Sequence, residues 1–206
     1  LFRYHLILYI TTPVVFLLAG WYSQARDRLH VYRFGLFLHL AYYGTLLFLQ
    51  ERATLYAEWL GVALGVTWGI YFAGANPFNF DVAMKGRREH YFGTLQTVTG
   101  LFSLLAPLIG GFLIRSADTP AEGYLYVFGV ICLLCLSCFA LSFFVPPDNE
   151  RRPYRIMRAL FPGDDQRDWR LIQIATVAQG GMEDILNFLL GLLLYIETQN
   201  ELSVGG

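Results

Sequence analysis

The chain has 206 residues, of which 55% are hydrophobic and 15% are charged, and its mean hydropathy is +0.44. Soluble domains carry about 25% charged residues, so this composition argues against a soluble globular domain. The formal net charge of −1 argues against a nucleic-acid partner. The charges cluster in short polar islands between long apolar runs, a pattern that predicts membrane spans joined by loops.

Six apolar runs are long enough to cross a bilayer core, which takes about 20 residues in a helix. In lipid the backbone must satisfy its own hydrogen bonds, and barrel strands are about 10 residues of alternating polarity, so these runs predict helices. The predicted fold is therefore all-α, a polytopic transmembrane bundle of about six transmembrane helices. The runs are 4–22, 31–49, 55–75, 91–114, 123–145 and 171–196.

Charged residues and prolines mark the joints between these runs. The third run is predicted to end at Asn76-Pro77, because the residue before a proline resists the helical region. Thr119-Pro120 separates the fourth run from the fifth, and Pro146-Pro147 ends the fifth.

The basic residues predict how the bundle is oriented. Of the 15 lysines and arginines, all but Arg3, Arg52 and Arg115 fall on one side of the alternating loops. The positive-inside rule makes that side cytoplasmic, so the loops 23–30, 76–90 and 147–170 are predicted to be cytoplasmic and the N-terminus of the segment outside. We expect a multi-pass protein of the plasma (inner) membrane, with an odd number of helices, most simply one, preceding this segment.

This layout resembles the major facilitator superfamily, whose members join two six-helix halves by a long cytoplasmic loop and handle substrate between the halves. The family's loop between helices two and three reads Gly, three residues, Asp, two residues, Gly, then basic residues. Gly20 and Arg28 match that pattern, whereas Gln24 stands at the acidic position and Asp27 at the second glycine. The resemblance implies helices 2–7 of a twelve-helix protein, with Gly20, Gln24, Asp27 and Arg28 as gating-loop candidates.

The resemblance also implies a domain organisation and a function. Residues 1–146 would be the remainder of an N-terminal bundle with five helices, 147–170 a cytoplasmic central linker, and 171–206 the first helix of a C-terminal bundle. The implied function is secondary active transport of a small solute by alternating access, with the segment inactive alone. The expected partners are the lipid bilayer, a small-molecule solute and a coupling ion; no nucleic acid, cofactor or metal is predicted.

Ionisable residues inside the apolar runs are the candidates for a substrate or ion site. Glu183 and Asp184 lie near the middle of the last run, where a carboxylate costs roughly 2.5–3.5 kcal/mol, and Asn187 shares the face of Glu183. The competing interpretation is that the helix starts later or is broken at Gly180-Gly181. His39 lies near the middle of the second run, and Glu58 lies about one turn inside the third, where it either snorkels to water or lines a cavity.

Small residues recur at every fourth position of the third run, which places them on one face of a helix. Such a face lets another helix approach closely, and packing is the favoured interpretation; a rocking surface for alternating access is compatible with it. The stripe consists of Ala57, Gly61, Gly65, Gly69 and Ala73.

Two other function classes compete with a transporter. A polytopic scaffold or channel subunit would share the composition, although the basic central loop and the mid-run carboxylates argue against it. An intramembrane enzyme is disfavoured because Gly-x-Ser-x-Gly and His-Glu-x-x-His are absent from the sequence. Cys132, Cys135 and Cys138 fall within one uncharged run and are interpreted as packing residues rather than cluster ligands.

Overall fold

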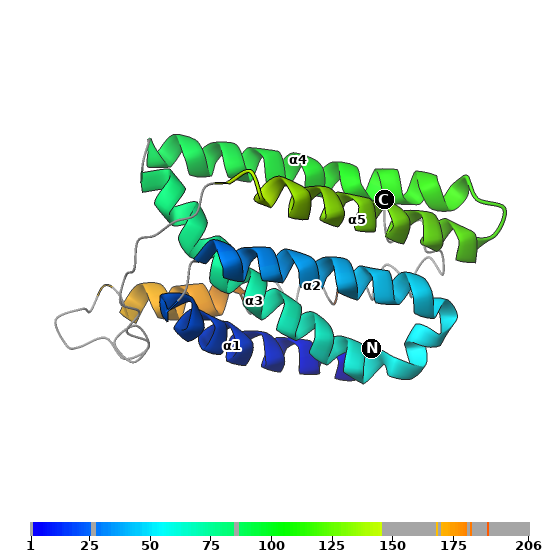
Figure 1. The fold of residues 1–206 in the computed structure, drawn as a ribbon, viewed down its shortest axis with the longest axis horizontal. Helices are drawn as coiled ribbons and strands as arrows, with labels where there is room; N and C mark the ends of the chain where they lie inside the picture. Colours follow the sequence, from blue (N-terminus) through cyan, green and yellow to red (C-terminus); the bar gives the residue numbers. More distant parts are fainter. Residues whose placement is uncertain are drawn as a thin grey trace. The chain divides into compact units, whose positions relative to one another are not determined.

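The computed structural model describes residues 2–25, 28–84, 87–145 and 170–180, together with residues 168, 182 and 189. The described chain is helical apart from short turns, and no strand occurs in these ranges, which confirms the all-α prediction (Figure 1). Its elements are α1 (Phe2–Ala25), α2 (Arg28–Leu49), the 3₁₀ helix η1 (Gln50–Tyr56), α3 (Ala57–Met84), α4 (Arg88–Arg115) and α5 (Pro120–Ser142).

The chain divides into two compact units. One comprises Leu1–Phe102 and Leu113–Tyr154, and the other comprises Ser103–Phe112 and Arg155–Gly206. The first unit contains α1, α2, η1, α3, α5 and both ends of α4. In the second unit, residues 170–180 form a helix, at the start of the predicted sixth span. The proposed linker 147–170 lies outside the described residues except for residues 168 and 170, so the predicted domain division stays a prediction.

Three of the described helices combine the length and the apolar composition of a membrane span. They are Arg3–Ser23 in α1, Arg88–Arg115 in α4 and Glu122–Ser142 in α5. Helices α2 and α3 have 22 and 28 residues, enough to cross a bilayer core of about 30 Å.

Helix α3 continues past the point where it was predicted to end. The expected boundary at Asn76-Pro77 is wrong, because the helix runs on to Met84 with Pro77 inside it. Packing outweighs the cost of the proline: Phe78 stacks on Tyr32 of α2 with ring centroids 5.9 Å apart, and Ala83 is 1% exposed. Of the described residues in the loop expected over 76–90, only Arg87 therefore lies outside a helix.

The glycines of α3 lie against the backbone of α1, which runs beside it (Figure 1). A Cβ atom at Gly61 would lie 2.8 Å from the carbonyl oxygen of Tyr4, and one at Gly69 would lie 2.8 Å from that of Thr12. Gly65 faces Thr11 in the same way, at 2.7 Å from its Cβ. These distances leave no room for a side chain, so the small residues permit the close approach of the two helices.

Two further glycines, one on each helix, bring α3 equally close to α2. A Cβ atom at Gly35 would lie 2.6 Å from the Cα of Tyr71, and one at Gly74 would lie 2.5 Å from the nitrogen of Tyr32. Helix α3 is therefore packed backbone to backbone on both sides. Of the two alanines in the predicted stripe, Ala73 is buried and Ala57 begins the helix.

Helices α2 and α5 are joined at one end by an arginine. The Arg33 guanidinium donates to the carbonyl oxygen of Ser142 from Nε at 3.2 Å and from Nη2 at 2.9 Å, and Nη2 also donates to that of Val145 at 3.1 Å. The guanidinium carbon lies 4.9 Å from the ring centroid of Phe143. At the other end of α5, Thr119 caps the helix by accepting a hydrogen bond from the Glu122 backbone nitrogen.

Candidate functional site

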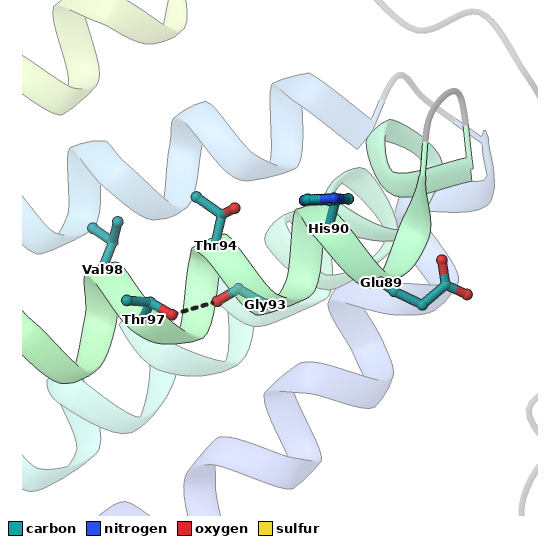
Figure 2. A pocket seen from close by; sticks show the side chains of 6 residues that line it. All are labelled: Glu89, His90, Gly93, Thr94, Thr97 and Val98. Carbon is teal, nitrogen blue, oxygen red and sulfur yellow. Dashed lines mark hydrogen bonds between the residues drawn. The ribbon is translucent and has the colours of Figure 1, made fainter.

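A groove of about 490 Å³ runs along the first turns of α4 (Figure 2). Its volume is within the range of small-molecule sites, about 300–1,000 Å³. In Figure 2 the labelled side chains follow one stretch of the helix, and the Thr97 hydroxyl donates to the Gly93 carbonyl oxygen at 2.8 Å. The lining residues are Glu89, His90, Gly93, Thr94, Thr97 and Val98.

The groove offers hydrogen-bonding chemistry on a helix that has the length of a membrane span. It combines one carboxylate, one imidazole and two hydroxyls, which can bind a polar solute through both donors and acceptors. None of the α4 residues is buried within the described part of the chain. In a lipid bilayer such polar groups need water or protein around them, so this face of α4 is suited to line an aqueous path rather than to contact lipid.

Contacts with the end of α3 position the start of this groove. The Tyr91 hydroxyl donates to Oδ1 of Asn79 at 2.9 Å. The Arg88 guanidinium lies 4.6 Å from the ring centroid of Phe80 and 5.9 Å from that of Phe92. The contacts of Tyr91 with Asn79 and of Arg88 with Phe80 hold the first turn of α4, with Glu89 and His90, against α3.

A second hollow, of about 610 Å³, lies where α1 meets η1 and the start of α3. Glu58, predicted either to snorkel or to line a cavity, does line it, and accepts a hydrogen bond from Arg3 at 3.3 Å. The Arg3 side chain is 83% exposed and that of Glu58 58% exposed, so this ion pair contributes at most about 1 kcal/mol. The hollow is also lined by Tyr4, Thr54, Leu55, Ala57 and Trp59.

His39 lies in the middle of α2, among aromatic side chains rather than beside the groove. Its Nδ1 is 2.9 Å from the Gly35 carbonyl oxygen, and its ring meets the Tyr71 ring edge to face at 5.0 Å between centroids. The structure therefore places His39 and Glu58 in different surroundings, and it does not bring them together into one site.

The other predicted site residues are described only in part. Gly20 is buried on α1, and Arg28 begins α2. The Gln24 side chain and Asp27 lie outside the described residues, so the gating loop stays a prediction. Glu183, Asp184 and Asn187 lie outside the described residues as well. Within the described ranges, no group of three or more His, Cys, Asp or Glu side chains has the geometry to hold a metal ion.

Sequence reasoning missed the α4 groove. The sequence-based prediction did not include Glu89, His90, Thr94 and Thr97, because it rested on charges in the middle of apolar runs. The signal was present: the polar residues at positions 90, 94 and 97 are spaced for one face of a helix, one just before the fourth apolar run and two inside it.

Comparison with known proteins identifies the family. The sequence profile of the Major Facilitator Superfamily matches residues 6–196. The chain belongs to this superfamily. Its family and its membrane-length apolar helices make it an integral membrane protein, as the apolar runs predicted.

Two relatives of this major facilitator chain come from bacilli. It is 27% identical over 202 residues to "Uncharacterized protein YqgE" of Bacillus subtilis (strain 168), a match that covers 98% of this chain and 47% of that protein. It is 30% identical over 145 residues to "Uncharacterized protein in sodM 3'region" of Geobacillus stearothermophilus, covering 70% of this chain and 67% of the relative. The chain thus spans about half the length of the first relative. No solved structure matches it significantly.

Proposed function

We propose that this chain belongs to a secondary active transporter that moves a small polar solute across the plasma membrane by alternating access. The observation that carries the proposal is the groove of Glu89, His90, Thr94 and Thr97 on a membrane-length helix. Its mixture of donors and acceptors suits a solute with several hydroxyl, amide or carboxylate groups. Membership of the superfamily supports transport in general.

The proposal includes an orientation and a source of driving force. The charge distribution supports an outer N-terminus for this segment, with the α1–α2 and α3–α4 joints and the 147–170 linker in the cytoplasm. The α4 groove then lies toward the cytoplasmic end of its helix, and the hollow beside Arg3 and Glu58 lies at the outer end. Glu183 and Asp184, with Asn187, are proposed to bind the solute or its coupling ion.

Water access to α4 tests the proposed path. In the intact transporter, with Cys132, Cys135 and Cys138 replaced by alanine, a single cysteine would be placed at Thr94 or at Leu95. Leu95 lies at the same depth but does not line the groove. A water-soluble, membrane-impermeant thiol reagent applied to inside-out vesicles should modify the cysteine at position 94 much faster. Equal rates at the two positions would contradict a water-filled groove.

Solute movement tests the function itself. Vesicles containing the intact transporter would be screened with radiolabelled sugars, amino acids and organic acids under an imposed pH gradient. We expect Asp184→Asn to abolish or uncouple accumulation, whereas Glu58→Gln, which removes only an exposed ion pair, should retain it. Unchanged gradient-driven uptake by the Asp184→Asn variant would exclude that carboxylate as the coupling site.

A further inference from the structure

His39 occupies a defined position in the middle of α2, 11 residues after Arg28 and 10 before Leu49. Its Nδ1 lies 2.9 Å from the carbonyl oxygen of Gly35. A carbonyl oxygen can only accept, so Nδ1 carries the hydrogen and donates it. In the neutral ring the lone pair is then on Nε2, which is the atom left to take up a proton.

The rings around His39 are suited to a positive charge. The Tyr71 ring of α3 lies 5.0 Å from the imidazole, with an angle of 72° between the planes. A cation within about 6 Å of an aromatic centroid is attracted when it lies over the face of the ring, so this contact stabilises an imidazolium when the Tyr71 face meets the imidazole edge. The Tyr43 ring lies farther away, at 6.5 Å. The Gly35 hydrogen bond also strengthens when the donor is charged.

The groups that face this cluster are neutral phenols and thiols. On α5, the Cys135 thiol lies close enough to Tyr43, and the Cys138 thiol close enough to Tyr71, to interact with each electrostatically. In the described part of the chain, no hydrogen bond or ion pair joins the His39 imidazole to a carboxylate, lysine or arginine. A proton gained here would therefore add a full positive charge to the interior of the helix bundle, with no ion pair to cancel it.

Aromatic residues lead from this cluster toward both ends of the bundle. In one direction Tyr43 contacts Tyr42 at 5.4 Å between centroids, and the Tyr42 hydroxyl lies 3.0 Å from that of Tyr4, beside the ion pair of Arg3. In the other direction Tyr71 contacts Tyr32, near the start of α2, at 5.6 Å. The phenol groups supply donors and acceptors along a line that is otherwise apolar.

We propose that His39 is a proton-binding site of this protein, taking a proton from water onto Nε2 while Nδ1 stays bonded to Gly35, and that Tyr71 holds the resulting imidazolium. Proton binding does not depend on transport. Its use to couple a proton gradient to solute movement rests on the proposed function.

Nitrogen NMR of the full chain in lipid nanodiscs tests the site directly. With ¹⁵N-labelled histidine the four imidazoles are visible, and the His39→Gln variant assigns the resonances of His39 by their loss. Between about pH 8 and about pH 4, Nε2 of His39 should change from unprotonated to protonated while Nδ1 remains protonated. A ring that stays neutral over this range, or one in which Nδ1 is the atom that titrates, would overturn the proposal.

Two substitutions of Tyr71 separate the ring from its hydroxyl. Tyr71→Leu should weaken proton binding at His39 roughly tenfold, because it removes the aromatic face, while Tyr71→Phe should leave the affinity nearly unchanged. Equal effects of the two variants would exclude stabilisation by the ring. The readout is independent of solute movement. If the protein takes up solute while His39 stays neutral, the proton-binding proposal fails and the proposed transport function stands. If His39 titrates as expected in a protein that moves no solute, the proposed transport function fails and the proton-binding proposal stands.

Discussion

Replacing Arg33 by glutamine should loosen the attachment of α2 to the end of α5. The wild-type guanidinium donates three hydrogen bonds to the carbonyl oxygens of Ser142 and Val145, at 2.9–3.2 Å, and lies over the Phe143 ring. A hydrogen bond to a charged group contributes about 1.5–3 kcal/mol, and a cation at a helix C-terminus or over a ring adds about 0.5–1 kcal/mol.

These contributions are not additive, and Arg33 is only half-buried. We therefore expect the Arg33→Gln substitution to lower the free energy of unfolding by about 2–3 kcal/mol. For a chain of this size each kcal/mol corresponds to about 2–4 °C, so the melting temperature should fall by about 4–12 °C. Arg33→Lys keeps the charge but not the forked donor geometry, and should lie between glutamine and wild type.

The cysteines of α5 provide the assay. Cys132, Cys135 and Cys138 all lie on the helix that Arg33 attaches, so a dye that becomes fluorescent on reaction with thiols reports its release during heating in detergent. Circular dichroism checks the same transition without a label. The matched control is Arg87→Gln, which removes an exposed arginine and should change stability by no more than about 0.5 kcal/mol. Indistinguishable melting of the Arg33→Gln and Arg87→Gln variants would refute the reasoning.

Three further predictions concern helix packing and capping, each tested by a substitution. Gly69→Ala should destabilise the protein by about 1–3 kcal/mol, because the new Cβ would lie 2.8 Å from the Thr12 carbonyl oxygen. Gly44→Ala, where nothing lies within 4 Å of the new Cβ, should stabilise the protein by up to about 1 kcal/mol through helix propensity. Thermal melting compares the two variants, and a change of stability with the same sign in both would contradict the α1–α3 contact. Tyr42→Phe should cost about 1 kcal/mol by removing the hydrogen bond to Tyr4, and no loss in urea or thermal unfolding would show that the pair is not formed. Thr119→Ala should cost about 0.5–2 kcal/mol through loss of the α5 N-cap, with Thr119→Ser as the conservative control that should melt like wild type.

Composition and charge were sufficient to predict the membrane and the helices, and the family was predicted from the resemblance of the helix layout to the major facilitator superfamily. The bilayer imposes one requirement on every span, about 20 apolar residues with internally satisfied hydrogen bonds, and this requirement is local to each segment. The runs 4–22, 31–49, 91–114 and 123–145 accordingly reappear as α1, α2, α4 and α5, with ends displaced by a few residues. The spacing of Gly61, Gly65 and Gly69 likewise indicated a face for close helix contact.

The candidate site was less accessible to sequence reasoning. Charge in the middle of an apolar run predicted a site at Glu183 and Asp184. The groove in the described structure is instead built from uncharged hydroxyls, with Glu89 and His90, in the first turns of α4. A hydroxyl in an apolar run can bond to its own helix, as Thr97 does, or face a cavity, and the pattern alone does not separate these cases.

Only the tertiary structure decided which neighbouring helix each helix face packs against. Pro77 reads locally as a helix end, but the helix continues to Met84, where contacts with α2 stabilise it. Nothing near His39 in the sequence indicates that Tyr71, 32 residues later, will lie against its ring. A bilayer acts on each segment separately and so leaves its mark on local composition, whereas contacts between helices depend on residues far apart in the chain, whose pairing is set when the helices pack.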